Sequence, residues 1–160
     1  MKFLRELIPY IIVIVVVIFI RTFIVTPVKV NGTSMYPTLD GGEIMLLNKL
    51  GKIDRYDIVV LKIDAENDNL IKRIIGLPGE TVEIKDNKVY INDKEFEDSF
   101  GYGITYNIDK VTLGDDEYFV LGDNRIVSLD SRVFGKIKKK DIKGTTNFII
   151  YPFKKIGKVK

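Results

Sequence analysis

The chain of 160 residues contains no cysteine and no histidine, and it has a single alanine, Ala65. The absence of cysteine excludes disulfides, structural zinc on thiolates and iron–sulfur clusters, and it leaves the redox state of the compartment open. Without histidine, any serine nucleophile needs a base other than imidazole, so a lysine, a carboxylate or a tyrosine must take that role. The net charge is +3, and no basic face interleaved with aromatic residues indicates binding to nucleic acid.

A long apolar run dominates the N-terminal part of the chain. Residues 7–20 are almost uninterrupted in this respect, and apolar residues continue after Arg21 as far as Val25. A membrane-spanning helix needs about 20 residues, and an arginine near its end can extend to the interface. Pro9 falls in the first turn, where its missing N–H is harmless. We therefore predict a transmembrane anchor over residues 6–25.

The flanking charges predict the orientation of this anchor. Lys2 and Arg5 precede it, so the positive-inside rule places residues 1–5 in the cytoplasm and residues 26–160 on the extracytoplasmic face of the cell membrane. Arg21 on the other flank opposes this assignment, so the excess of positive charge that supports the predicted orientation is small.

Two other interpretations of the apolar run are less well supported. A cleavable secretory signal needs small side chains at the −3 and −1 positions, and the nearest candidate, Val30-Asn31-Gly32, is poor. A buried helix of a soluble protein would show more polar interruptions than residues 13–20 do. An uncleaved, single-pass anchor is the favoured prediction.

After residue 40 the chain shows no convincing helical period. Short runs of β-branched and aromatic residues, separated by Gly, Asp and Asn, predict strands instead. They cover residues 43–47, 58–63, 70–75, 81–84, 89–91, 117–121 and 146–151. The predicted fold class is therefore mainly β, with one transmembrane helix followed by an antiparallel β-sheet domain. Residues 93–116 are polar and irregular and predict a short, loop-rich insertion.

One hairpin can be placed in register from the sequence. In residues 82–91 a two-residue turn, Asp86-Asn87, pairs Lys85 with Lys88. The same register sets Ile84 opposite Val89 and Val82 opposite Ile91, so all four apolar residues share one face.

The C-terminal segment, residues 136–160, is strongly basic. It holds nine lysines against one acid, Asp141. On a membrane-tethered domain this charge favours contact with anionic lipid headgroups. A solvated face that aids solubility explains it equally well.

Three segments do not read as ordinary strands and turns. Ser34 lies between Gly32 and Pro37, Lys72 interrupts an apolar strand, and residues 121–132 form a loop dense in hydroxyls and charges. A lysine with its ordinary pKa of about 10.4 is a poor base near neutral pH, at a handicap of roughly 4 kcal/mol. Burial among apolar groups lowers such a pKa, so a neutral Lys72 can accept the Ser34 proton. Taken singly, each of these residues is more often structural than catalytic.

The three segments together, in this order behind an anchor, resemble the type I signal peptidase (leader peptidase) family of serine endopeptidases, in its compact bacterial form. The matching segments are Ser34-Met-Tyr-Pro-Thr-Leu39, Tyr56-Asp-Ile-Val-Val60, Lys72-Arg-Ile-Ile-Gly-Leu-Pro-Gly-Glu80 and Gly122-Asp-Asn-Arg-Ile-Val-Ser-Leu-Asp-Ser-Arg132. The resemblance implies removal of signal peptides from exported precursors, with small residues at the −3 and −1 positions. It implies no metal and no organic cofactor.

The resemblance also assigns roles to residues. Ser34 would be the nucleophile and Lys72 the general base, while Ser128 would orient the lysine amine. Asp130 and Arg132 would form a supporting salt bridge, and Asp123 would belong to the same polar network. Arg73 is predicted to form a structural ion pair with either Asp123 or Asp130.

The sequence departs from the family pattern at two positions. Gly32 stands where some members carry a hydroxyl residue that helps to hold the oxyanion, so the backbone N–H of Ser34, with a water or the Thr33 hydroxyl, would have to serve. Tyr56 stands where many members have glycine before the aspartate, which we interpret as a minor change.

Two rival functions stay open at this stage. One is a membrane-tethered β-domain that binds an extracytoplasmic partner, including an inactive signal-peptidase-like protein. The other is a repressor-type Ser/Lys autoprotease, which the anchor disfavours. The partners predicted by the favoured reading are precursor proteins and the lipid bilayer, and the oligomeric state is open.

Overall fold

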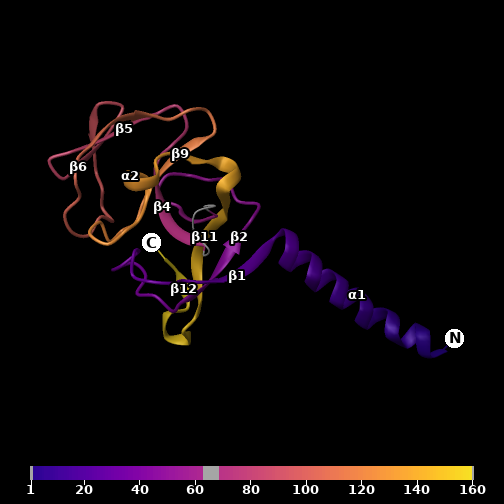
Figure 1. The fold of residues 1–160 in the computed structure, drawn as a ribbon. Coiled ribbons are helices and arrows are strands. Elements are labelled where there is room, and N and C mark those ends of the chain that lie inside the picture. The colour runs from indigo at the N-terminus through magenta and orange to yellow at the C-terminus, as the bar shows by residue number, and fades with distance from the viewer. Residues whose placement is uncertain (1, 63–68, 160) are drawn as a thin grey trace.

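A single long helix projects from a β domain (Figure 1). The computed structural model describes residues 2–62 and 69–159. Helix α1 covers Lys2–Phe23 with Pro9 inside it. Its segment Glu6–Phe23 has a mean hydropathy of 2.3, and none of this segment is buried in the rest of the chain. The helix is long and apolar enough to cross a bilayer, consistent with a membrane anchor.

The helix is followed at once by the first strand. Strand β1 begins at Val25, which pairs with Asn48. Residues 24 and 25, which the hydropathy assigned to the end of the span, therefore form the turn and the start of this strand. The boundary between α1 and β1 is set by the pairing of β1 with β2, and the apolar character of residues 24 and 25 does not reveal it.

The larger of two antiparallel sheets has the strand order β1-β2-β11-β3-β4-β9-β10, and β12 also pairs with β11. Its strands are β1 Val25–Lys29, β2 Ile44–Asn48, β3 Ile58–Leu61, β4 Leu70–Gly76, β9 Glu117–Leu121, β10 Ile137–Lys138, β11 Ile142–Tyr151 and β12 Gly157–Lys158. The central strands β3, β4 and β9 are buried over almost their whole length, which explains why their sequences are mostly apolar apart from Lys72 and Arg73 in β4.

A smaller sheet has the order β7-β6-β5-β8. Its strands are β5 Thr81–Lys85, β6 Lys88–Ile91, β7 Lys94–Phe96 and β8 Ile108–Thr112. The β5–β6 hairpin has the predicted register, with Lys85 opposite Lys88. Its four apolar residues are buried on one face, as expected: Val82, Ile84, Val89 and Ile91. The mainly β, antiparallel prediction is confirmed.

Several elements were not expected from the sequence. Strands β7 and β8 lie inside residues 93–116, which the sequence predicted to be rich in loops. The two-residue strands β10 and β12 and the one-turn helix α2, Ser131–Phe134, are too short to leave a periodic pattern. Two short 3₁₀ turns, Lys139–Asp141 and Phe153–Lys155, complete the basic C-terminal segment. The predicted strand 58–63 ends at Leu61, and its last residue lies outside the described residues.

The two sheets meet where β4 passes into β5. One apolar cluster joins residues of both sheets: Ile75, Val82, Ile84, Val89, Ile91, Leu113, Phe119 and Leu121. At this junction a Cβ on Gly76 would lie 2.6 Å from the Val82 side chain and 2.9 Å from that of Phe119. Only glycine allows this close approach. The second sheet therefore packs directly against β4, the strand that carries Lys72.

Candidate active site

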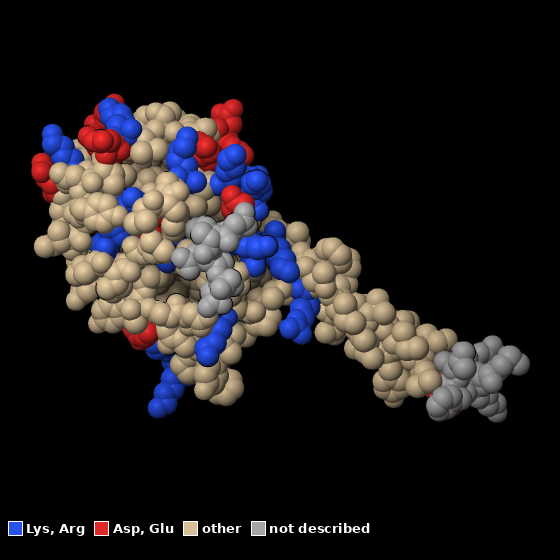
Figure 2. Space-filling view, viewed as in Figure 1, with Lys and Arg blue, Asp and Glu red and all other residues tan. Residues whose placement is uncertain are grey.

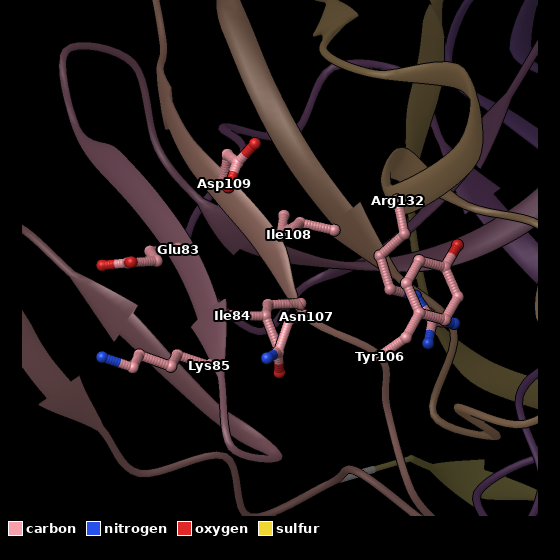
Figure 3. A pocket seen from close by; sticks show the side chains of 8 residues that line it. All are labelled: Glu83, Ile84, Lys85, Tyr106, Asn107, Ile108, Asp109 and Arg132. Carbon is pink, nitrogen blue, oxygen red and sulfur yellow. The ribbon is translucent and has the colours of Figure 1, made fainter.

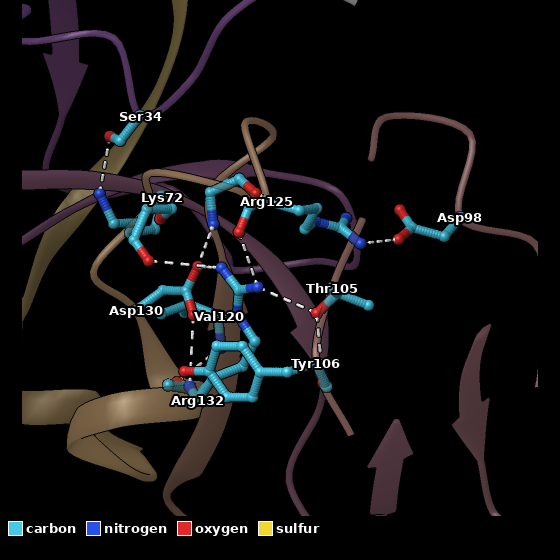
Figure 4. Close-up of polar contacts among 12 residues, drawn as sticks. Ser34, Lys72, Asp98, Thr105, Tyr106, Val120, Arg125, Asp130 and Arg132 are labelled. Atoms are coloured by element: carbon cyan, nitrogen blue, oxygen red, sulfur yellow. Dashed lines mark hydrogen bonds and ion pairs between the residues drawn. The ribbon is translucent and has the colours of Figure 1, made fainter. Parts of the chain in front are cut away.

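Ser34 and Lys72 lie in direct contact. Ser34 is in the loop that follows β1, and Lys72 is in the middle of β4. The Lys72 Nζ donates to Ser34 Oγ at 2.8 Å and to the carbonyl of Ile71 at 3.0 Å (Figure 4). The lysine is 2% exposed, whereas the serine is half-buried. The buried amine of Lys72 thus contacts the Ser34 hydroxyl, which is still accessible to solvent.

Apolar side chains form part of the surroundings of the lysine. Val59, fully buried, is its cross-strand partner in β3. Ile71 and Met35, the chain neighbours of Lys72 and Ser34, belong to one buried cluster. Apolar surroundings disfavour the charged form of an amine. The geometry can therefore support proton transfer from the hydroxyl to the amine.

The loop after β9 holds the Ser34 loop in place. The backbone N–H of Asn124 donates to the Ser34 carbonyl at 3.0 Å, and the Asn124 side chain donates to the Thr33 carbonyl at 3.3 Å. A Cβ on Gly122 would lie 2.5 Å from the Ser34 carbonyl and 2.1 Å from Ser128 Oγ. Asn124 and Gly122 received no role from the sequence, although both lie within the matching segment. The sequence signal that could have indicated their role is a glycine followed directly by two polar residues, Asp123 and Asn124.

Arg73, the neighbour of Lys72, pairs with Asp123, one of its two predicted partners. Its Nε and Nη2 donate to the two Asp123 carboxylate oxygens at 2.8 and 2.6 Å, and both side chains are almost fully buried. Asp123 also accepts from the Thr38 hydroxyl at 2.5 Å, and Arg73 donates to the Tyr56 carbonyl at 2.8 Å. The Arg73 guanidinium lies over the Phe100 ring, 3.7 Å from its centroid. This network ties β4 to the loop on each side of the site.

Asp130 and Arg132 form the expected salt bridge. Two guanidinium nitrogens of Arg132 each lie 2.8 Å from an oxygen of Asp130, and neither side chain is exposed. Asp130 also caps helix α2 by accepting from the Arg132 N–H, and it accepts from the Gly122 N–H at 2.9 Å. Arg132 donates further to Thr105 at 2.9 Å, which connects the residue 122–132 loop to the segment before β8. Figure 4 shows this network beside the Ser34–Lys72 pair.

Ser128 is buried close to Ser34 and Lys72, but it does not make the hydrogen bond to the Lys72 amine that its expected role suggests. Its hydroxyl has no hydrogen-bond partner among residues 2–62 and 69–159, so the contact with the Lys72 amine is not a hydrogen bond in this structure. The hydroxyl instead fills the space that a Gly122 side chain would occupy.

Gly32 and Thr33 lie on the open side of the serine. Both are exposed. Gly32 has a φ of +77°, and a Cβ there would meet nothing within 4 Å. Space for a side chain therefore exists at this position, but the left-handed backbone favours glycine.

Tyr56 is more than the minor change that its position suggested. Its φ is +70°, a left-handed conformation that costs a residue with a side chain about 1–2 kcal/mol. Its ring stacks with Phe96 at 5.4 Å and packs on Phe100 at 5.3 Å, and its hydroxyl donates to the Glu97 carbonyl at 2.8 Å. Burial, together with the nearby Asp98 carboxylate, raises the pKa of Tyr56, so the hydroxyl stays a donor. The backbone geometry explains why glycine suits this position.

A third buried ion pair, between Arg125 and Asp98, was not predicted from the sequence. Arg125 donates to the Gly122 carbonyl at 3.0 Å, and its backbone N–H donates to the Tyr102 carbonyl at 2.9 Å. A side chain on Gly101 would strike the pair. The pair thus fastens the segment before β8 onto the residue 122–132 loop.

A cavity of about 570 Å³ lies elsewhere, over the small sheet (Figure 3). It is lined by Glu83, Ile84, Lys85, Tyr106, Asn107, Ile108, Asp109 and Arg132. Its mixed charges do not converge on one ligand type. Within the described part of the chain, no group of three or more acidic side chains has the arrangement of a metal site.

Comparisons with known proteins identify the family of this chain. The sequence model of the family described as "Signal peptidase, peptidase S26" matches residues 4–151. The chain belongs to the signal peptidase family. A relative from Bacillus subtilis (strain 168), Signal peptidase I S, is 41% identical over 92% of this chain and 89% of its own length. Signal peptidase I of Streptococcus pneumoniae serotype 4 is 34% identical over 98% of this chain and 97% of its own.

A solved structure shows the same fold. The crystal structure of a signal peptidase I from Enterococcus faecalis V583 is 32% identical, with a TM-score of 0.54 over 60% of this chain and 97% of that one. The predicted family is therefore confirmed: this signal peptidase is a serine endopeptidase, a hydrolase that removes signal peptides. Its apolar helix and its family both fit a membrane-anchored protein.

Proposed function

We propose that this signal peptidase cleaves precursors through a Ser34–Lys72 dyad and an acyl-enzyme. The observation that carries the proposal is the 2.8 Å contact between Ser34 Oγ and a lysine that is 2% exposed. A buried amine in contact with a reachable hydroxyl is the arrangement that serine activation without imidazole requires.

The acylation step begins with a neutral Lys72. Its Nζ takes the Ser34 proton while Oγ attacks the scissile carbonyl carbon, and the carbonyl oxygen becomes an oxyanion. The Lys72 ammonium then gives its proton to the leaving amine as the C–N bond breaks. The carboxyl side of the precursor departs, and the signal peptide stays esterified to Ser34.

Deacylation uses the same lysine. Lys72 takes a proton from water, whose oxygen attacks the ester carbonyl, and the ester C–O bond breaks as the proton returns to Ser34 Oγ. The backbone N–H of Ser34 would stabilise the oxyanion in both halves, with the Thr33 hydroxyl or a water in place of a side chain at Gly32. Each well-placed donor is worth about 3–4 kcal/mol.

The supporting residues keep this geometry. Asp123 would hold Arg73 beside Lys72, and the Asp130–Arg132 pair would hold the loop that fixes the Ser34 carbonyl. Ser128 would limit the movement of the lysine by filling the space beside Gly122.

The substrate is an exported precursor in extended conformation with small residues at −3 and −1, held by its own apolar segment in the bilayer. The proposed topology is residues 1–5 in the cytoplasm, an anchor within residues 6–25, and residues 26–160 outside the cytoplasm. An inactive, partner-binding β-domain is the rival that the cleavage assay tests.

The deciding experiment incubates the detergent-solubilised full chain with a labelled precursor that carries alanine at −3 and −1. We expect cleavage by the parent and none by Ser34→Ala or Lys72→Ala, with both variants folded by circular dichroism. Ser131→Ala, whose hydroxyl accepts from Val120 away from the dyad, is the matched control for serine removal. Full turnover by either dyad variant would exclude the assignment.

The pH dependence tests the lysine in particular. Because an amine base is partly protonated at pH 7, we expect cleavage to rise as the pH increases above neutrality. The profile should be measured as kcat against pH. A Lys72→His variant that matched the parent at pH 7 would contradict the amine requirement.

A further inference from the structure

The loop that carries Ser34 is closed at its base by backbone hydrogen bonds. This loop joins β1 to β2. The Val30 N–H donates to the Glu43 carbonyl at 2.8 Å, and the Gly42 N–H donates to the Val30 carbonyl at 2.8 Å. These two bonds extend the antiparallel pairing of β1 with β2. Glu43 therefore lies where the two ends of the loop meet.

Residues 40–43, the base turn, also pack against the backbone just before the nucleophile. A Cβ on Gly41 would lie 2.8 Å from the Gly32 carbonyl oxygen, and Gly41 has a φ of +90°. Only glycine allows the two backbone segments to approach so closely. Gly32 lies two residues before Ser34, whose N–H is the proposed oxyanion donor. A shift of the base turn would therefore move this donor.

The Glu43 side chain is a buried charge inside this arrangement. It is 2% exposed. Its Oε1 accepts from the Asp40 N–H at 3.1 Å and from the Lys155 Nζ at 2.7 Å, and Oε2 has no hydrogen-bond partner among residues 2–62 and 69–159. Burial raises the pKa of Glu43, but its hydrogen bonds lower the pKa by more, so the carboxylate is charged at neutral pH. A buried carboxylate of this kind depends on its cation.

Lys155 reaches Glu43 from the basic C-terminal segment. Strand β11 ends at Tyr151, which pairs with Ile44 of β2, and the second 3₁₀ turn follows directly. The Lys155 Nζ also lies 2.6 Å from an oxygen of Asp40, which is exposed. At the lower end of the domain in Figure 2, basic side chains lie beside an acidic one, as expected of an ion pair at the surface. One lysine thus contacts both an exposed and a buried carboxylate of the base turn.

We propose that Lys155 is a positioning residue for the cleavage reaction. It holds the Glu43 carboxylate, and through it the base turn, so that the Ser34 N–H stays directed at the oxyanion. Lys155 contacts no reacting atom and acts only through Glu43. The family model matches the chain as far as residue 151, so family membership does not imply this contact. The inference rests on the proposed function of the Ser34–Lys72 dyad.

The expected effect of losing Lys155 follows from the burial of Glu43. Without its cation, the carboxylate is driven toward water, and the base turn moves with it because Glu43 belongs to that turn. A small misplacement of an oxyanion donor raises the barrier of the chemical step. Contacts that hold the rest of the precursor are not altered. The loss should therefore appear in kcat and not in KM.

Kinetics of the full chain in detergent test the proposal. Lys155→Ala should lower kcat about tenfold on the precursor with alanine at −3 and −1, and KM should stay within about twofold of the parent. Lys154→Ala, which alters the exposed neighbour on the same 3₁₀ turn, is the matched control and should behave like the parent. Lys155→Arg retains the cation and should restore most of kcat. A Lys155→Ala variant with the kcat of the Lys154→Ala control would overturn the proposal.

A double-mutant cycle tests the route through Glu43. Glu43→Gln should also lower kcat, and Lys155→Ala should add little in that background, because the charge that Lys155 holds is already gone. Asp40→Asn removes only the exposed partner and should leave kcat unchanged. Additive losses from Glu43→Gln and Lys155→Ala, or a loss in Asp40→Asn as large as that in Lys155→Ala, would exclude this route.

Amide hydrogen exchange separates positioning from a general loss of stability. In Lys155→Ala, exchange should become faster in residues 30–36 and stay unchanged in the hairpin at residues 82–91. Unchanged exchange in residues 30–36, or faster exchange in both segments, would contradict a positioning role. This measurement needs no cleavage. A parent that fails to cut the precursor, with exchange still faster in residues 30–36 of the variant, would refute the proposed function but leave the hold of Lys155 on the loop intact.

Discussion

The two sheets of this signal peptidase treat charge in opposite ways. The large sheet and the loop beside it bury Lys72, Arg73, Asp123 and Asp130. The small sheet buries apolar side chains and keeps its ion pairs at the surface: Lys88–Glu95 and Lys110–Asp93, all of them about half exposed or more. A buried charge costs several kcal/mol unless it is paired and hydrogen-bonded. The large sheet buries charged groups around the candidate active site despite this cost, whereas the charged groups of these small-sheet ion pairs remain exposed to solvent.

The contrast shows which charges have fixed positions. Each buried carboxylate near Ser34 has several donors in a defined geometry, whereas the surface pairs of the small sheet are screened by solvent and salt. Rigid charges can orient a reacting group, but exposed charges mainly keep the surface soluble. Substitutions that are matched between the two sheets test this difference.

The largest difference is expected for lysine removal. Lys72→Ala should lower kcat about a thousandfold or more, because a general base is lost. Lys88→Ala in β6 should leave kcat unchanged. Both rates are to be measured on the same precursor. A comparable loss in both variants would show that cleavage depends on overall charge and not on the buried amine.

The next largest difference concerns stability. Asp123→Ala should lower the free energy of unfolding by about 3–5 kcal/mol, since Arg73 stays buried without its carboxylate. The double variant with Arg73→Leu should recover part of this loss. Glu95→Ala is the exposed control and should leave the thermal midpoint unchanged. Chemical denaturation of the full chain in detergent provides the measurement, and an Asp123→Ala variant as stable as the parent would contradict the argument.

A smaller effect is expected at Tyr56, which couples the sheets by packing on Phe96 of β7. Tyr56→Ala removes the ring but retains the left-handed strain, whereas Tyr56→Gly removes both. The glycine variant should therefore be more stable than the alanine variant by about 1 kcal/mol. Equal stabilities, or the usual preference for alanine, would show that the backbone is not strained there.

The smallest effect depends on pH. Burial raises the pKa of Glu43, but hydrogen bonds from Lys155 and from backbone N–H groups outweigh it, so the pKa lies below the ordinary value of 4.5. Stability from this carboxylate is present above pH 4.5 and is lost as the pH falls through the lower folded-state value. Glu43→Gln should flatten the fall in stability between pH 5 and more acid conditions, and Glu95→Gln should not. Unfolding curves at several pH values provide the test, and parallel curves for parent and Glu43→Gln would refute it.

The parts of the fold that could be predicted depend on neighbours in the sequence. An unbroken apolar run identifies the anchor helix from composition alone. The hairpin at residues 82–91 follows from a period of two around a short turn, so its register needed no distant information. The short strands β10 and β12 depend on partners far along the chain, which no local pattern reveals.

The candidate site divides in the same way. The sequence by itself singled out the residues that we propose to carry the chemistry, because Ser34, Lys72 and Asp130 lie in distinctive local segments and imidazole is absent. Only the tertiary structure decided that Arg73 pairs with Asp123 and that Tyr56 occupies a left-handed backbone. The tight packing beside Gly122 was likewise set by the fold. Such features arise where segments distant in sequence pack together, because burial, hydrogen-bond partners and backbone strain are properties of contacts and not of composition.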